Sequence, residues 1–156
     1  MIFKNEEQLK EHLLSKCKNA VSKTEEKVHR VIDATLNKFY DEFEPDEYIR
    51  TGQLLHSLVR SGVKPTGSGF EAEVYFDEGM LNYQNGMMYL KNTPEHGRYG
   101  WATWNGGKVL DVAMTGGLPH GAYAAGTPIW ITSEAKLGNI MEMLKQELIK
   151  QGIPIK

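Results

Sequence analysis

The chain of 156 residues contains a single cysteine, Cys17, which excludes an intrachain disulfide and a cysteine-based zinc cluster. Its sequence also lacks an apolar run approaching the roughly 20 residues that a membrane-spanning helix needs. The first residues have neither a signal-peptide nor a transit-peptide pattern. We therefore expect a protein that is made in a cytoplasm and has no membrane partner. Cys17 lies on the apolar side of a helical pattern, where we expect a buried structural thiol.

Neither sign of charge is in large excess, because 18 basic residues face 20 acidic ones and the net charge is −2. A dedicated nucleic-acid binder usually has a basic excess or a dense basic stripe, so no specific nucleic-acid partner is expected. The hydrophobic fraction of 40% and the charged fraction of 24% are ordinary for a globular protein. At this length, residues 1–156 are most simply one domain with a sizeable core.

The N-terminal region, residues 1–44, has no glycine or proline between Glu6 and Phe43. Its apolar residues recur at spacings of three, four and seven, which predicts an amphipathic helix. A helix of about 37 residues would be roughly 55 Å long, longer than a domain of this size covers. Either the helix breaks near Ser22–Glu25, whose Ser-Lys-Thr-Glu order is a capping-box signal, or one end projects and packs on another subunit.

The stretch from Pro45 to Ser61 separates this helical pattern from a sheet-like one. Proline lacks a backbone donor and disfavours a helical residue before it, so the helix should end near Phe43. Thr51 is the predicted N-cap of a short turn of helix, with Gly52 just inside it. Arg50 precedes the cap, where its guanidinium could bind a carboxylate.

Within this turn Leu54, Leu55 and Leu58 should lie on one side and Ser57 on the opposite, polar side. The hydroxyl and imidazole groups here lack the spacing of a nucleophile, a base and an orienting acid. The stretch is therefore interpreted as an elbow between helix and sheet, and we expect no catalytic residues in it.

Residues 58–63 and 70–76 predict a β-hairpin around the turn cluster Pro65–Gly69. The second strand alternates most regularly, with one apolar face and one polar face. The apolar face comprises Phe70, Ala72, Val74 and Phe76.

Residues 77–128 are rich in glycine, asparagine, aromatic residues and methionine. Asn105-Gly106 favours the tight turn of a hairpin over residues 101–114, and Asn85-Gly86 favours another. Ile129–Ile131 is predicted as a last short strand. Ser133 is then the expected N-cap of a C-terminal helix, residues 132–152, which Gly152 and Pro154 close.

The predicted fold class is therefore α+β. It comprises a long N-terminal helix (1–44), a small antiparallel sheet with an inserted glycine- and aromatic-rich arm (45–131), and a C-terminal helix (132–152).

No metal or cofactor site is expected. The histidines His56, His96 and His120 have no spacing typical of metal ligands relative to each other or to acidic residues. The glycine-rich segments also lack the strand–glycine-rich loop–lysine–helix order of a phosphate-binding loop.

The aromatic residues of the central arm have three interpretations: stacking on sugars or bases, anchoring a protein interface, or covering the second face of the sheet. A mixture of core and interface is favoured, because the long helix already indicates assembly. The candidate interface residues are Tyr83, Tyr89, Trp101, Trp104 and Tyr123.

The segment Tyr48-Ile-Arg-Thr-Gly-Gln-Leu-Leu-His-Ser-Leu58 resembles the Arg/Asp-Thr-Gly-x-Leu-x-x-Ser-Leu/Ile signature of minor virion proteins of tailed bacteriophages. These are neck, head–tail joining and tail-completion proteins, also called minor tail proteins. The strand at 70–76 and the Thr127–Trp130 lead into a C-terminal helix are similar to the layout of that family. Residues 111–121 look like a variant from phages of Gram-positive hosts.

The resemblance implies a non-enzymatic viral structural protein, found in the virion tail or neck and made in the host bacterial cytoplasm. Such a subunit would assemble into a homo-oligomeric ring and contact neighbouring head–tail connector or tail proteins. Simpler family members have a much shorter middle, so residues 80–125 are an elaboration without an implied role. On this view the elbow residues are structural: Arg50, Thr51, Gly52, Leu55 and Ser57.

A second hypothesis stays open from the residues themselves. The chain would then be an intracellular phage-encoded binding protein or effector, with a histidine and aromatic site in the central arm that depends on His96 or His120. It predicts a stable monomer or dimer with a defined ligand, whereas the first hypothesis predicts concentration-dependent oligomers.

Overall fold

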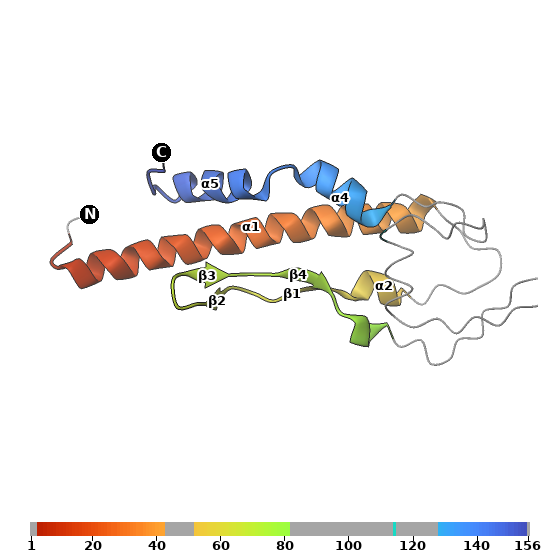
Figure 1. Cartoon of the computed structure of the whole chain (residues 1–156), viewed down its shortest axis with the longest axis horizontal. Coiled ribbons are helices and arrows are strands. Elements are labelled where there is room, and N and C mark those ends of the chain that lie inside the picture. The colour runs from red at the N-terminus through yellow and green to blue at the C-terminus, as the bar shows by residue number, and fades with distance from the viewer. Residues whose placement is uncertain (1–2, 43–51, 82–113, 115–127, 156) are drawn as a thin grey trace, which may run out of the picture. The chain divides into compact units, whose positions relative to one another are not determined.

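The computed structural model describes residues 3–42, 52–81, 114 and 128–155. Its helices and short antiparallel strands confirm the predicted α+β class (Figure 1). The elements in chain order are α1 (Glu6–Glu42), α2 (Gln53–His56), β1 (Leu58–Arg60), β2 (Lys64–Pro65), β3 (Phe70–Glu71), β4 (Val74–Phe76), the 3-10 helix η1 (Glu78–Met80), α4 (Ile129–Leu137) and α5 (Ile140–Lys150).

The backbone contacts divide the chain into two units. Unit 1 comprises Met1–Val31, Arg60–Tyr75 and Ala135–Lys156. Unit 2 comprises Ile32–Val59 and Phe76–Glu134.

Helix α1 is one unbroken helix of 37 residues. It starts where the Asn5 side chain accepts a hydrogen bond from the Gln8 backbone N–H, at 2.9 Å, which satisfies one of the free donors of the first turn. Of the two alternatives, the break at Ser22–Glu25 is wrong, because α1 continues through these residues. Thr24 does not act as a cap there: its hydroxyl donates to the Ala20 carbonyl one turn earlier in the same helix. Cys17 is half-buried rather than buried.

The predicted hairpin is present as a two-stranded ribbon in which β1 pairs with β4 and β2 with β3. Exposure alternates along residues 70–76 as the pattern indicates. The register changes along the ribbon: Ser61 donates to Glu73, but Lys64 lies opposite Glu71. Two residues, Gly62 and Val63, thus face Ala72 alone, which is a β-bulge.

The C-terminal region differs from the prediction. Ile129–Ile131 is the first turn of α4 and not a strand, and Ser133 lies inside that helix rather than at its N-cap. The single helix expected over 132–152 is two helices. Gly138 between them has a φ of 60°, a left-handed conformation that glycine adopts at little cost, and Asn139 caps α5 by accepting from the backbone of residues 141 and 142.

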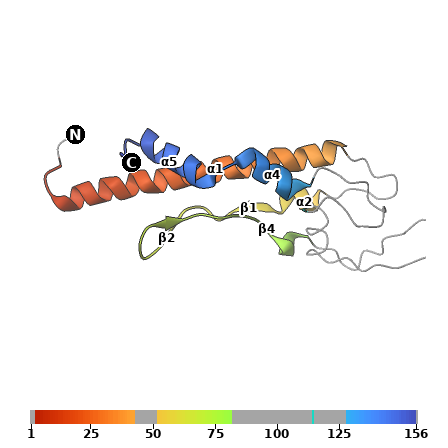
Figure 2. The same cartoon turned by 45° about the horizontal axis from the view of Figure 1, so that its top comes forward.

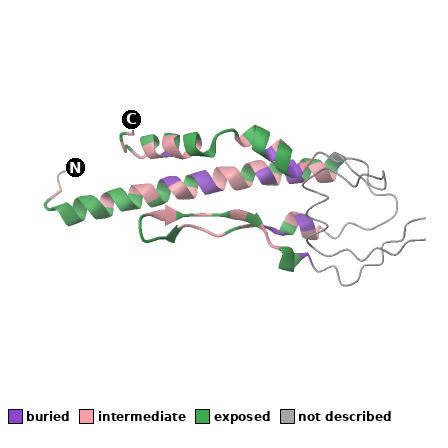
Figure 3. Cartoon of the chain, viewed as in Figure 1, coloured by how far each residue is buried: buried purple, intermediate pink, exposed green. Residues whose placement is uncertain are grey.

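Unit 1 packs α5 and the ribbon against the N-terminal part of α1 (Figures 1 and 2). Its buried described residues are Ala20, Thr24, Glu25 and Glu147. Those of unit 2 are mostly aliphatic: Ile32, Leu36, Leu54, Leu58, Leu81 and Ile129, with Thr35, Ser57 and Ser133. Figure 3 shows the buried residues in purple.

Candidate functional site

The elbow is described from Gly52 onward, and its residues up to Val59 belong to unit 2. Gly52 has a φ of 70° and is itself the N-cap residue of α2, without a side-chain cap. The prediction that Thr51 caps this turn with Gly52 inside it is therefore wrong. A left-handed backbone conformation at this position favours glycine. Arg50 and Thr51 lie outside the described residues.

Ser57 is the hydrogen-bonding centre of the elbow, not a residue of its polar surface. Its side chain is fully buried, and its hydroxyl donates to the Leu54 carbonyl at 2.8 Å. Its carbonyl accepts from the Asp77 backbone N–H at 2.8 Å. Ser57 therefore connects the end of α2 to the segment that precedes η1, and its hydroxyl is unavailable as a nucleophile.

The leucines of this turn have different positions. Leu54 is buried, with 7% of its surface exposed, and Leu58 is buried as well. Leu55, which we named as a structural elbow residue, is only half-buried. The two leucines that match the signature, Leu54 and Leu58, are thus the ones that enter the core.

A buried carboxylate lies at the bulge of the ribbon in unit 1. Glu25 of α1 accepts a hydrogen bond from the Gly62 backbone N–H at 2.8 Å and pairs with Arg60 at 3.0 Å. The bulge takes Gly62 out of the strand ladder, and the carboxylate satisfies the N–H that is thereby freed. Glu25 therefore attaches the ribbon to the helix at one defined register.

A second buried carboxylate joins α5 to α1. Glu147 of α5 is 5% exposed and accepts hydrogen bonds from Lys27 of α1 and from Lys150. The hydrogen bond from Lys27, and then that from Lys150, hold the pKa of the Glu147 carboxyl below its ordinary value of 4.5, against the effect of burial. The same contact raises the pKa of Lys150. This arrangement stabilises helix packing.

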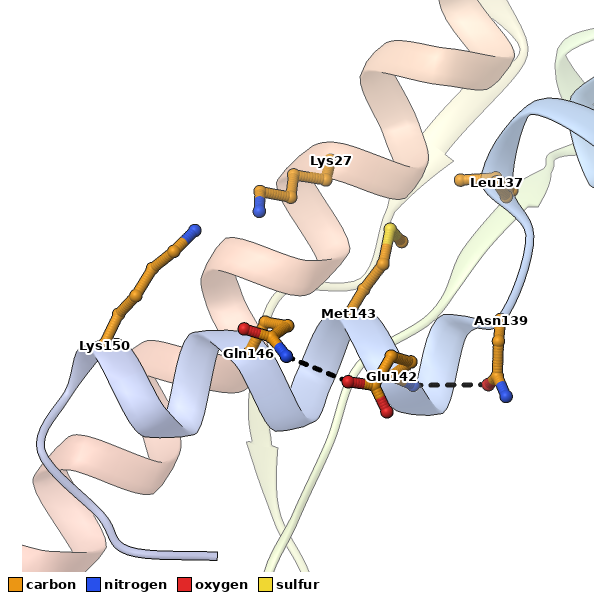
Figure 4. Close-up of a pocket in the computed structure, with 7 residues that line it drawn as sticks. All are labelled: Lys27, Leu137, Asn139, Glu142, Met143, Gln146 and Lys150. Carbon is orange, nitrogen blue, oxygen red and sulfur yellow. Dashed lines mark hydrogen bonds between the residues drawn. The ribbon is translucent and has the colours of Figure 1, made fainter.

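An open hollow of about 440 Å³ lies beside this ion pair in unit 1 (Figure 4). Glu142 in its wall accepts from Gln146, and Asn139 is occupied in capping α5. Its lining comprises Lys27, Leu137, Asn139, Glu142, Met143, Gln146 and Lys150. The two lysines of the lining are bonded to Glu147. Its polar groups are thus engaged in contacts that hold α5, and we interpret the hollow as a groove left by helix packing.

The candidate interface residues Tyr83, Tyr89, Trp101, Trp104 and Tyr123 all lie outside the described residues, as do His96 and His120. His56 is exposed on α2. Within residues 3–42, 52–81 and 128–155, no group of three or more metal-ligating side chains is arranged to hold an ion. In that same part of the chain, no helix is long and apolar enough to cross a membrane.

Comparison of the chain with protein-family models, with curated proteins and with solved structures found no match.

Sequence reasoning missed the two carboxylate sites because Glu25 and Glu147 fall among many solvated glutamates in amphipathic helices. Only the Gly62 bend offered a signal, since a glycine inside a strand pattern often marks a bulge. The chemistry of the described sites is that of structural hydrogen bonds and ion pairs.

Proposed function

We propose that this chain is a non-enzymatic minor virion protein of a tailed bacteriophage. It is a neck or tail subunit that joins head and tail through ring assembly, with its own copies and adjacent connector or tail proteins as partners.

The observation that carries the proposal is how the described residues of the Thr-Gly-x-Leu-x-x-Ser signature are used. Gly52 stands at the start of α2 with a positive φ. Leu54 enters the core, and Ser57 is buried and hydrogen-bonded to backbone. A signature whose residues build a scaffold is expected in a family that shares a fold for assembly, whereas a catalytic signature would present a reactive group to a substrate.

The exposed apolar side chains of unit 1 also support the proposed ring assembly. Several of its large apolar side chains are about 40% exposed or more, among them Leu9, Leu13, Leu14, Met141 and Ile149. Such residues are common at interfaces between subunits. Closed rings need heterologous contacts between unlike surfaces of neighbouring copies, and a chain with several half-exposed apolar segments can provide two such surfaces.

The test is quantitative mass spectrometry of gradient-purified particles from the phage or prophage that carries this gene. We expect a few copies per particle, comparable with the portal protein. The abundance of host cytosolic proteins in the same gradient fraction shows how much protein co-purifies without being part of the particle. If this chain is no more abundant than those proteins, the structural function is wrong.

Alanine variants at His96 and His120 separate the proposal from the alternative of an intracellular effector or binding protein. An assembly protein should keep its copy number per particle in both variants, because neither histidine has a role in that function. Loss of binding to a defined ligand in these variants, together with absence from particles, would favour the alternative.

A further inference from the structure

Helix α5 is held in unit 1 without a fully buried apolar side chain (Figure 3). Among its residues, all of which the structure describes, the one buried side chain is the charged Glu147. Met143, Leu144 and Leu148 are half-buried. Helix α4 differs, because its Ile129 is completely buried. The packing of α5 is therefore weaker in apolar contacts than that of α4.

Two lysines of α1 supply the polar contacts that hold α5. Lys27 donates to the Glu147 carboxylate. Lys16 donates to the Gln151 carbonyl at the end of α5, where the negative end of the helix dipole favours a cation. Lys16 and Lys27 are separated by about three helical turns, so they lie on one side of α1. Ala20, one turn after Lys16, lies on that side and is fully buried, so we infer that α5 covers it.

The backbone of residues 139–153 makes its hydrogen bonds within itself. Asn139 caps the start of α5. At the other end the Gly152 N–H donates to Ile149 at 2.8 Å and the Ile153 N–H donates to Leu148 at 3.0 Å, which is a Schellman motif. Before α5, Gly138 has a φ of 60°, and nothing lies within 4 Å of a Cβ placed there. This segment can therefore leave α1 without breaking a backbone hydrogen bond to another described segment.

We propose that residues 139–153 are a releasable cover, which detaches from α1 as one unit at Gly138 while α1 and α4 stay folded. Release breaks the two lysine contacts and exposes half-buried side chains, which costs less than exposing a completely buried residue such as Ile129. An isolated helix of about 11 residues is marginal in water, so the released segment should lose its helix. The side of α1 that carries Ala20 is then uncovered. This motion lies within unit 1 and does not depend on the proposed virion function.

Native-state hydrogen exchange of the purified full chain tests whether the cover opens by itself. Amides of α5 should have protection factors at least about tenfold lower than those of residues 28–36 of α1. Their exchange should also depend little on urea at low concentration, because a local opening exposes little surface. If both segments have the same protection factors and the same urea dependence, α5 opens only when the whole chain unfolds, and the proposal is wrong.

Substituting Lys27 tests what holds the cover closed. Lys27→Met keeps an apolar stem but removes the ammonium group, so it should lower the protection of α5 roughly tenfold and leave residues 28–36 of α1 unchanged. Lys23→Met is the matched control, because Lys23 pairs with Glu26 at the surface of the same helix. It should change neither segment. An equal loss of protection in both segments, or equal effects of the two variants on α5, would contradict the proposal.

A cysteine at residue 20 tests which surface the cover hides. Ala20→Cys in a Cys17→Ser background should react slowly with a thiol reagent, and the added Lys27→Met change should accelerate labelling by the same factor as it accelerates exchange in α5. Labelling that Lys27→Met leaves unchanged would show that α5 does not cover this side of α1. Circular dichroism verifies that the cysteine variants fold, and the exchange experiments need no cysteine variant.

Discussion

Unit 1 and unit 2 bury different kinds of side chain, although α1 contributes residues to both. The buried residues of unit 1 include two carboxylates, Glu25 and Glu147, each held by a cation. Those of unit 2 include six aliphatic side chains, of which Leu36 and Ile129 are completely buried. The described part of the chain therefore combines a unit joined by charge-assisted hydrogen bonds with a unit joined by apolar packing.

This difference indicates what each kind of contact contributes. A fully buried aliphatic side chain stabilises a fold by about 1.5–3 kcal/mol without fixing a direction. A buried ion pair adds little net stability, because desolvation offsets much of the attraction, yet removing one partner is costly. We infer that unit 2 carries more stability per residue, whereas the contacts of unit 1 select the register of the ribbon and of α5.

The largest loss of stability should come from Leu36→Ala, because this change leaves a cavity in the apolar core of unit 2. Truncating a fully buried leucine costs about 2–5 kcal/mol of unfolding free energy. Ile149→Ala in unit 1 is the matched change, and it should cost less than about 1 kcal/mol, because Ile149 is 44% exposed. Urea denaturation measures both. Equal losses would contradict the contrast between the units.

The next largest loss of stability should come from Glu25→Gln. The amide keeps the shape of the side chain but removes the charge that binds Arg60 and the Gly62 N–H. We expect a loss of about 1–3 kcal/mol, with increased hydrogen exchange at Gly62. Glu26→Gln is the control, since the adjacent Glu26 pairs with Lys23 and Arg30 at the surface. Its unfolding free energy should not change measurably.

The pH dependence of stability tests the second carboxylate. The pKa of the Glu147 carboxyl is lowered in the folded chain. Its contribution to the free energy of unfolding is therefore complete above the ordinary pKa of about 4.5, and it is lost as the pH falls below that value. Denaturation between pH 7 and pH 3 should therefore show a steeper loss for the wild type than for Glu147→Gln. Parallel pH profiles would mean that Glu147 does not hold α5 on α1.

A smaller effect is expected from Gly62→Ala at the bulge. The φ of Gly62 is +69°, and nothing lies within 4 Å of a Cβ placed there, so the change isolates backbone strain from steric conflict. We expect a loss of about 1 kcal/mol. Gly67→Ala, in equally open space without a positive φ, should be nearly neutral. A similar loss at both positions would show that the bulge conformation is not the cause.

The smallest change in stability is expected at Ser133, one of two buried serines of unit 2. Ser133 is 1% exposed, and its hydroxyl has no hydrogen-bond partner in the described structure, whereas Ser57 donates to Leu54. Ser133→Ala should therefore stabilise the protein by about 0.5 kcal/mol, helped by the higher helix propensity of alanine. Ser57→Ala should destabilise it by about 1 kcal/mol. Thermal unfolding should therefore show a raised Tm for Ser133→Ala and a lowered Tm for Ser57→Ala.

Local patterns predicted the main elements because each depends on neighbours in sequence. Helix α1 follows from apolar spacing without glycine or proline, and the alternation over 70–76 follows from strand geometry. The same reasoning failed at Ser133 and Ile129–Ile131, where β-branched residues and a serine indicated a strand and a cap. Their positions inside α4 depend on burying Ile129 completely, which tertiary packing decides over local propensity.

The sequence by itself determined the α+β class, the long helix, the alternating strand and the glycine at the elbow, since these depend on backbone preference and periodicity. Tertiary structure alone decided which glutamates are buried and where the ribbon shifts register. It also decided that the Ser57 side chain is buried in the elbow and does not lie on its polar surface. The physical reason is that a carboxylate or hydroxyl can be buried only where partners distant in sequence satisfy its hydrogen bonds. Glu25 with Gly62, and Glu147 with Lys27, are such pairs.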